Sequence, residues 1–176
     1  MLHPLVTQLR FTRREFMRAI KGVSEADATR RLMPMNCISW NVGHLAWQEQ
    51  RYFLFYAQGR MPWPEIQKQF AYGAPGITPP LKEMLKAWKV ITAAVDPWLD
   101  KLTRAKLQDY VVRDGKRTDI MFGNLLQRVI YHYWYHTGEN SAIRQALGHT
   151  KLPVFVGNID DEAPYRPETT TSAKRS

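Results

Sequence analysis

The hydrophobic positions of the chain recur at helical spacing in four segments. Side chains three, four and seven residues apart share one face of an α-helix, so this repeat predicts helices that each bury one face. The pattern runs over about 4–21, 39–59, 79–102 and 119–147. Four amphipathic helices of this kind are typical of a bundle. We therefore predict an all-α fold, an antiparallel four-helix bundle in a single domain.

Turn-forming residues support these limits. Ser39 is a suitable N-cap for the second helix, and Gly148 is a suitable stop for the fourth. Pro97 is expected to bend the third helix. The connection 59–78 is rich in glycine and proline, which excludes a continuous helix there. The segment 107–118 has the composition of a turn or a short extended piece, and the rest of the chain carries almost no strand signal.

The composition indicates one packed domain. The chain has 176 residues, of which 44% are hydrophobic and 12% aromatic. We expect the bundle to occupy residues 1–150 and a C-terminal extension to follow at 151–176, with its end disordered. The single cysteine, Cys37, excludes an internal disulfide and is typical of a reducing compartment. No secretory signal or membrane span is recognisable, so a cytoplasmic protein is predicted.

The formal net charge of +9 raises the question of an anionic partner. Arg10, Arg14 and Arg18 are four residues apart on the first helix and predict a basic, solvated strip. The other basic residues are scattered, and no zinc-finger or RNP-type signature accompanies them. We predict a small-molecule substrate, with no nucleic-acid and no membrane partner. The aromatic surplus of the second helix makes a homodimer plausible.

The stretch YHYWYHTGEN, residues 131–140, places three polar residues in the apolar stripe of the fourth helix. His132, His136 and Glu139 share the face that Leu125 and Val129 should bury. A buried polar group without a partner costs about 1 to 3 kcal/mol, so three of them need a common partner. Two histidines four residues apart project from one face a turn apart, which suits two imidazoles on one zinc-like ion. A metal ion is therefore a candidate partner.

This spacing is not that of the metalloprotease helix H-E-x-x-H, because Tyr133 occupies the position of its general base. Hydrolysis is therefore not predicted. His44 lies in the second helix, which can face the fourth helix in a bundle. Three imidazoles would leave an open coordination position, as in catalytic metal sites. The second helix is apolar nearly all round, so periodicity leaves the direction of His44 open.

Other polar residues near the stripe have alternative roles. Glu139 either accepts a hydrogen bond that orients an imidazole, which we place first, or acts as a general acid or base, or is a fourth ligand. Arg144 is either a surface ion-pair partner or binds a carboxylate of a cofactor or substrate. His3 and His149 lie at helix ends, where we interpret them as surface or capping residues.

Two blocks of the sequence resemble the DinB-like superfamily, namely NCISWNVGHLAWQEQ and LQRVIYHYWYHTGENSAIRQALGH. The likeness covers about residues 4–150. It implies a four-helix bundle with a three-histidine metal site whose ligands correspond to His44, His132 and His136. The family includes thiol-dependent transferases and isomerases and the metal-binding domain of ergothioneine-type synthases. The second domain of those synthases is not recognisable here, so sulfoxide synthesis by this chain alone is not expected.

Together these features predict a divalent-metal-dependent transferase that activates a low-molecular-weight thiol at the three-histidine site. Three imidazoles suit zinc, nickel or iron. In this hypothesis Glu139 assists catalysis, and Arg144 or the arginines of the first helix bind the thiol cofactor. The alternative is a non-catalytic module that binds a metal or a small ligand at the same site.

Overall fold

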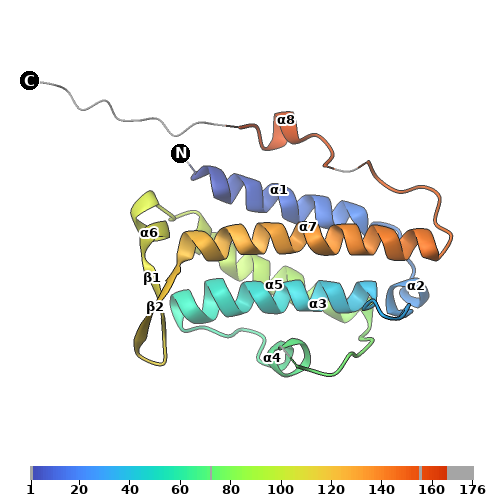
Figure 1. Cartoon of the computed structure of the whole chain (residues 1–176), viewed down its shortest axis with the longest axis horizontal. Coiled ribbons are helices and arrows are strands. Elements are labelled where there is room, and N and C mark those ends of the chain that lie inside the picture. The colour runs from blue at the N-terminus through green and yellow to red at the C-terminus, as the bar shows by residue number, and fades with distance from the viewer. Residues whose placement is uncertain (1, 72, 155, 166–176) are drawn as a thin grey trace, which may run out of the picture.

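Four long helices lie side by side in the computed structural model, which describes residues 2–71, 73–154 and 156–165 (Figure 1). They are α1 (Pro4–Ala19), α3 (Ile38–Glu49), α5 (Leu81–Leu99) and α7 (Phe122–Ala146). Their apolar faces meet in one continuous core, in which Leu9, Leu45 and Ile91 are fully buried. The predicted all-α four-helix bundle is confirmed.

The second predicted helix changes its winding halfway along. After α3 the chain continues without a break as a π-helix, η1 (Gln50–Tyr56), and Gly59 follows with a positive φ of 65°. A π-helix closes hydrogen bonds from residue i to i+5 and is wider than an α-helix, and such segments are frequent at functional sites. The hydrophobic pattern over 39–59 predicted the extent of this helix but not its wider turns.

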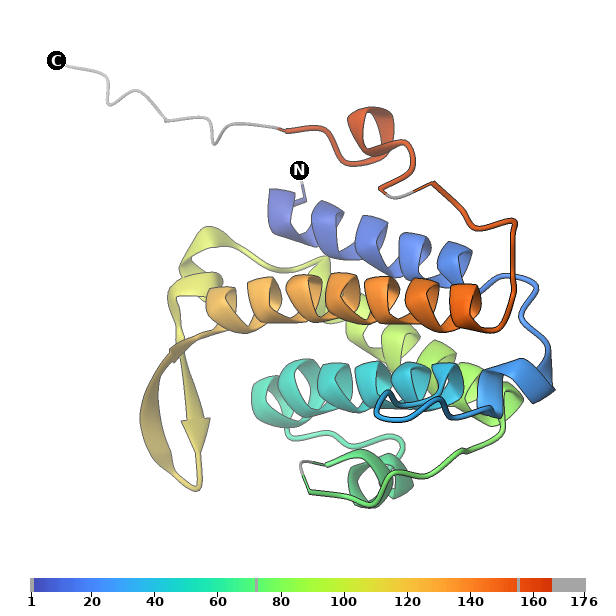
Figure 2. The same cartoon turned by 45° about the vertical axis from the view of Figure 1, so that its right-hand side comes forward.

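The direction of each helix follows from the connections. Helices α3 and α5 run one way, while α1 and α7 run the other way (Figures 1 and 2). The packing of two rings agrees with the parallel direction of α3 and α5, since Phe53 near the end of η1 stacks on Trp98 near the end of α5 with ring centres 5.4 Å apart. The two parallel neighbours α3 and α5 are joined by a long connection that returns along the bundle and carries α4 (Glu65–Phe70). The glycine-rich and proline-rich segment 59–78 thus contains one short helix.

Three further short helices were not predicted. They are α2 (Glu25–Thr29), α6 (Arg104–Gln108) and α8 (Ile159–Glu162). Side chains cap the first two, because the Ser24 hydroxyl accepts from the Asp27 N–H and the Thr103 hydroxyl accepts from the Lys106 N–H. Within such four- to five-residue pieces the apolar period has no room to repeat, so only the caps of α2 and α6 could have indicated a helix.

A two-stranded antiparallel sheet precedes α7. Its strands are β1 (Tyr110–Arg113) and β2 (Lys116–Met121), joined at Asp114 and Gly115, which both have positive φ. An Asp-Gly pair suits this kind of tight hairpin turn. The predicted extended piece at 107–118 is therefore a hairpin. The fourth helix begins at Phe122 rather than near residue 119, because the residues up to Met121 pair with β1.

The arginine face of α1 is exposed at Arg14 and partly exposed at Arg10 and Arg18, but the predicted basic strip is paired within the chain. Arg10 pairs with Asp100 of α5 at 2.8 Å, and Arg14 pairs with Glu162 of α8 at 2.7 Å. Arg18 donates to a backbone carbonyl of the C-terminal extension. Carboxylates from distant parts of the chain therefore neutralise Arg10 and Arg14, and a backbone carbonyl accepts a hydrogen bond from Arg18. Among the described residues, no helix is both long and apolar enough to cross a membrane.

Candidate metal centre

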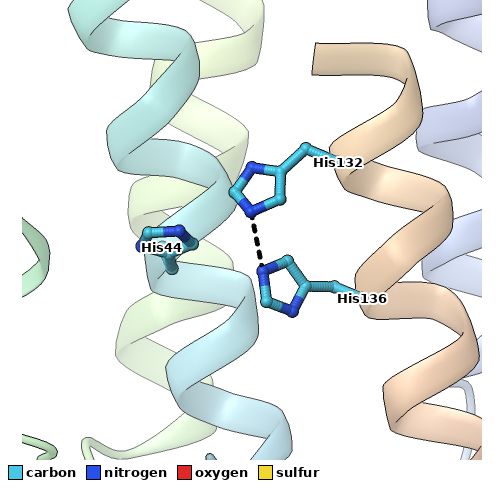
Figure 3. A group of neighbouring side chains, drawn as sticks. All are labelled: His44, His132 and His136. Atoms are coloured by element: carbon cyan, nitrogen blue, oxygen red, sulfur yellow. Dashed lines mark hydrogen bonds between the residues drawn. The ribbon is translucent and has the colours of Figure 1, made fainter. Parts of the chain in front are cut away.

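Three imidazoles converge between α3 and α7. His44 projects from α3, and His132 and His136 project from α7 toward it (Figure 3). One ring nitrogen from each lies within 4.8 Å of the others. The closest pair is Nε2 of His132 and Nε2 of His136, which are 2.9 Å apart. The structure thus brings together the three histidines that the sequence singled out.

The local sequence explains why these rings meet. His132 and His136 are one turn apart on α7, and α3 crosses this face in the opposite direction. Asn41, three residues before His44, fixes the alignment of the two helices. Its side-chain amide donates to the Asn140 side-chain oxygen at 2.8 Å and to the Glu139 carboxylate at 2.9 Å. This asparagine was not predicted, although its spacing places it on the His44 face.

Helix α4 approaches His44 from the other side. A side chain on Gly43 would collide with the Phe70 ring, since an added Cβ would lie 2.3 Å from it. The glycine therefore allows α4 to pack closely against α3. At that contact the backbone carbonyl of Phe70 lies 3.3 Å from Nδ1 of His44. Helix α3 therefore contacts α4 at His44 as well as α7.

Hydrogen bonds set the tautomers of two imidazoles. A carbonyl oxygen only accepts, so Nδ1 of His44 carries the proton and donates to Phe70. Nδ1 of His136 donates to the Glu139 carboxylate at 2.7 Å. In the neutral form of each ring, the lone pair is then on Nε2, the nitrogen that a metal would use.

The surroundings keep two of the imidazoles neutral. Burial, together with the neighbouring His136, lowers the pKa of His44 to about 4 and that of His132 to about 3. The hydrogen bond to the Phe70 carbonyl and the Glu139 charge raise the pKa of His44 but offset this only in part. At neutral pH these rings are uncharged and can donate their lone pairs.

The donor set fits a divalent ion. Around a tetrahedral ion with bonds of about 2.0 to 2.1 Å, neighbouring ligand nitrogens lie about 3.3 Å apart. The spacing of 2.9 Å for one pair and at most 4.8 Å within the group brackets this value. Nδ1 of His132 is buried and lacks a hydrogen-bond partner among the described residues, so the contact of its Nε2 with His136 is the hydrogen bond that this ring makes there. Small ring movements would bring all three nitrogens to one ion.

Glu139 lies behind His136 rather than among the three nitrogens. Its carboxylate contacts Nδ1 of His136, the nitrogen that points away from the other rings. Burial alone would raise the pKa of Glu139, but hydrogen bonds from His136 and Asn41 outweigh it and lower the pKa. The carboxylate is therefore ionised and suited to accept the imidazole N–H.

Aromatic rings surround the cluster. Trp40 stacks on His44 with ring centres 4.5 Å apart, and Trp47 stacks on the same ring at 5.2 Å. Tyr135 lies edge-on to His136 at 5.2 Å and is 70% exposed. His136 itself is buried, whereas His44 and His132 are partly exposed. The site is thus bordered by apolar rings but open to solvent on the side of two of its histidines.

Arg144 lies at the far end of α7. It is eight residues after His136, or about 12 Å along the helix axis. Its guanidinium is buried and donates to the Ala19 carbonyl and to Nδ1 of His149. His149 also lies 3.3 Å from the Asp27 carboxylate, so it connects the end of α7 to α2. His3 accepts from the Leu5 N–H and caps α1, as its position indicated.

A buried polar network next to the histidines was not predicted. Arg13 of α1 donates to Glu49 of α3 through Nε at 2.8 Å, and the Tyr133 hydroxyl of α7 donates to the same carboxylate at 2.7 Å. Trp88 of α5 donates to the Tyr133 hydroxyl at 2.7 Å. One network therefore joins all four helices. Arg13 is adjacent to Arg14 in the sequence, and its contact with the buried Glu49 distinguishes it from the other arginines of α1.

The fold and the histidine cluster define a helical-bundle protein with a candidate metal centre. Residues 8–139 match the DinB superfamily. The chain therefore belongs to this superfamily, and the resemblance seen in the sequence is confirmed. No curated protein matches the chain.

Proposed function

We propose that the chain binds one divalent ion through Nε2 of His44, His132 and His136, and that this ion serves catalysis. The observation that carries the proposal is the convergence of three imidazoles from two helices, of which burial keeps His44 and His132 neutral. Three protein ligands leave a coordination position open, as in catalytic rather than structural sites. The partial exposure of His44 and His132 gives a small molecule access to that position.

Within this proposal, the reaction is the transfer of a low-molecular-weight thiol to an electrophile. A divalent ion, when bound, lowers the pKa of a coordinated thiol, so that the thiolate nucleophile forms near neutral pH. Glu139 holds the proton on Nδ1 of His136 and so keeps Nε2 directed at the cluster. Trp40 and Tyr135 border the site with apolar surface for the electrophile.

Metal analysis and a thiol assay test this function. Protein purified without a histidine tag should contain about one divalent ion per chain by elemental analysis. With a panel of thiols and an activated aryl halide, it should accelerate transfer for at least one thiol, and a chelator should abolish the rate. A metal-loaded protein with no rate above background for any thiol would instead support the non-catalytic binding module.

Glu139→Gln should retain the metal. The amide oxygen still accepts from Nδ1 of His136, while the negative charge that strengthens the bond is lost. We expect metal affinity or transfer rate to fall by about 10- to 100-fold, as for partners that orient a ligand. Elemental analysis of the variant and the wild type, purified in parallel, measures this. A variant as empty of metal as a histidine variant would show that Glu139 is itself a ligand.

A further inference from the structure

The face of α3 that carries His44 continues past the cluster into η1, where it reaches an arginine. His44, Trp47 and Arg51 are three and four residues apart and therefore share one side of the helix. The Trp47 ring is 5.2 Å from the His44 ring, and the Arg51 guanidinium carbon lies 5.2 Å from the Trp47 ring centre. Seven residues of helix place Arg51 about 10 Å from His44 along the axis.

A second arginine meets the first one on Tyr56. The Arg51 Nε donates to the Tyr56 hydroxyl at 2.7 Å, and the Arg113 guanidinium lies 4.8 Å from the centre of the same ring. The π-helical turns of η1 explain the first contact, because their i to i+5 repeat brings residues five apart to the same side. Arg113 comes from the hairpin, at the end of β1. Two cations from distant segments thus share one aromatic ring.

Neither cation is neutralised. Within the described part of the chain, neither Arg51 nor Arg113 forms an ion pair, although both are partly buried. Nε of Arg113 is buried and has no hydrogen-bond partner among these residues. By contrast, Arg13, Arg10 and Arg14 of α1 all pair with carboxylates. Stacking on aromatic rings holds a guanidinium by its flat face and leaves its edge N–H groups available to an anion.

The hairpin side of Tyr56 also provides room. An open hollow of about 640 Å³ is lined by Tyr56, Tyr110, Lys106 and Arg117, among others. The Arg117 guanidinium lies 3.7 Å from the centre of the Tyr110 ring, which repeats the stacking of Arg113 on Tyr56. Lys106 is paired with Asp109, but no ion pair of Arg117 occurs among the described residues. The hollow is a basic, aromatic surface that shares Tyr56 with the two arginines, although neither of them lines it.

We propose that Arg51 and Arg113 bind a carboxylate of the molecule whose thiol lies at the three histidines. The inference rests on the proposed function and names its substrate class, a thiol of about tripeptide size that carries a carboxylate about 10 Å from its sulfur. Arginine forks match carboxylates in geometry, and bonds between two charged groups are the strong ones. Arg144 and the arginines of α1, the other candidates for this role, already have partners in the structure.

Calorimetric titration of the zinc-loaded full chain tests the site with two probes. Glutathione has a thiol and two carboxylates, and S-methylglutathione has the carboxylates but no free thiol. We expect Arg51→Gln and Arg113→Gln each to lower the affinity for both tripeptides by about tenfold, which is the effect of losing one charge-assisted hydrogen bond. Diethyl esters of the tripeptides, in which the carboxylates are blocked, should bind the wild type and Arg51→Gln equally.

Arg30→Gln is the matched control, since it removes one positive charge from an exposed arginine at the C-cap of α2, at the other end of the bundle from the hairpin. The affinities of this variant for the two tripeptides should lie within about twofold of the wild-type values, because surface charges beyond a Debye length are screened. If Arg51→Gln does not fold, Arg113→Gln decides the question, because its residue lies in the hairpin outside the bundle.

The outcomes separate the carboxylate site from the proposed function. Arg51-dependent binding of S-methylglutathione without any thiol transfer would keep the carboxylate site and refute the transferase. If the protein transfers a thiol but Arg51→Gln and Arg113→Gln do not change the affinities for the tripeptides, the transferase is kept and the carboxylate site is refuted. The carboxylate site is also overturned if neither tripeptide binds the wild type, or if Arg30→Gln weakens binding as much as the other two variants do.

Discussion

His136→Ala is expected to purify with almost no divalent metal, while the wild type carries about one ion per chain. His136 is the most buried of the three histidines, and its Nε2 lies 2.9 Å from that of His132. Without it, two imidazoles on different helices remain, and two ligands hold a zinc-like ion far less well than three. The Glu139 carboxylate would also lose the N–H that it accepts.

Elemental analysis of untagged protein measures the metal, and His3→Ala is the matched control. His3 caps α1 and takes no part in the histidine cluster, so its loss should cost about 1 kcal/mol of stability and no metal. A chelator should lower the melting temperature of the wild type and of His3→Ala, because a ligand that binds only the folded state stabilises it. It should not affect His136→Ala. A fully loaded His136→Ala protein would refute the three-histidine centre.

The sequence predicted the part of this site that lies within one helix. The spacing of His132, His136 and Glu139 places them on one face whatever surrounds the helix, so the contact between His136 and Glu139 followed from periodicity. The approximate extents of the long helices were predicted for the same reason, but Ser39 is not the N-cap of α3, which begins at Ile38 after Cys37. The hairpin and the start of α7 were less well defined, because strand pairing replaced helical hydrogen bonds in the residues before Phe122.

Contacts between helices could not be derived from periodicity. The direction of His44 depends on which face of α3 meets α7, and α3 is apolar nearly all round. The close approach of Phe70 at Gly43 also required the path of the long connection between α3 and α5. For His44 the family resemblance supplied what the pattern did not. Arg51 had no such aid, because its significance depends on a π-helical turn and on a hairpin residue distant in the sequence.

Glu49→Ala is expected to lower the free energy of unfolding by about 3 to 5 kcal/mol, the cost of leaving one partner of a buried ion pair alone. Glu49 is fully buried and accepts from both Arg13 and Tyr133. Burial lowers the pKa of Arg13, but the charge of Glu49 outweighs it and raises the pKa, so the guanidinium stays charged. In the variant, the remaining carboxylate partner of Arg13 is Asp96, which lies at 2.9 Å and is partly exposed. The variant therefore buries a cation with too little compensation.

Denaturant titration measures the change, and Glu162→Ala is the matched control. Glu162 also pairs with an arginine of α1, Arg14, but both side chains are about half exposed, so its loss should cost at most about 1 kcal/mol. Replacing both members of the buried pair, as in Arg13→Met with Glu49→Leu, should cost clearly less than Glu49→Ala, because no unpaired charge then remains in the core. If Glu49→Ala is no less stable than Glu162→Ala, the network does not hold the four helices together.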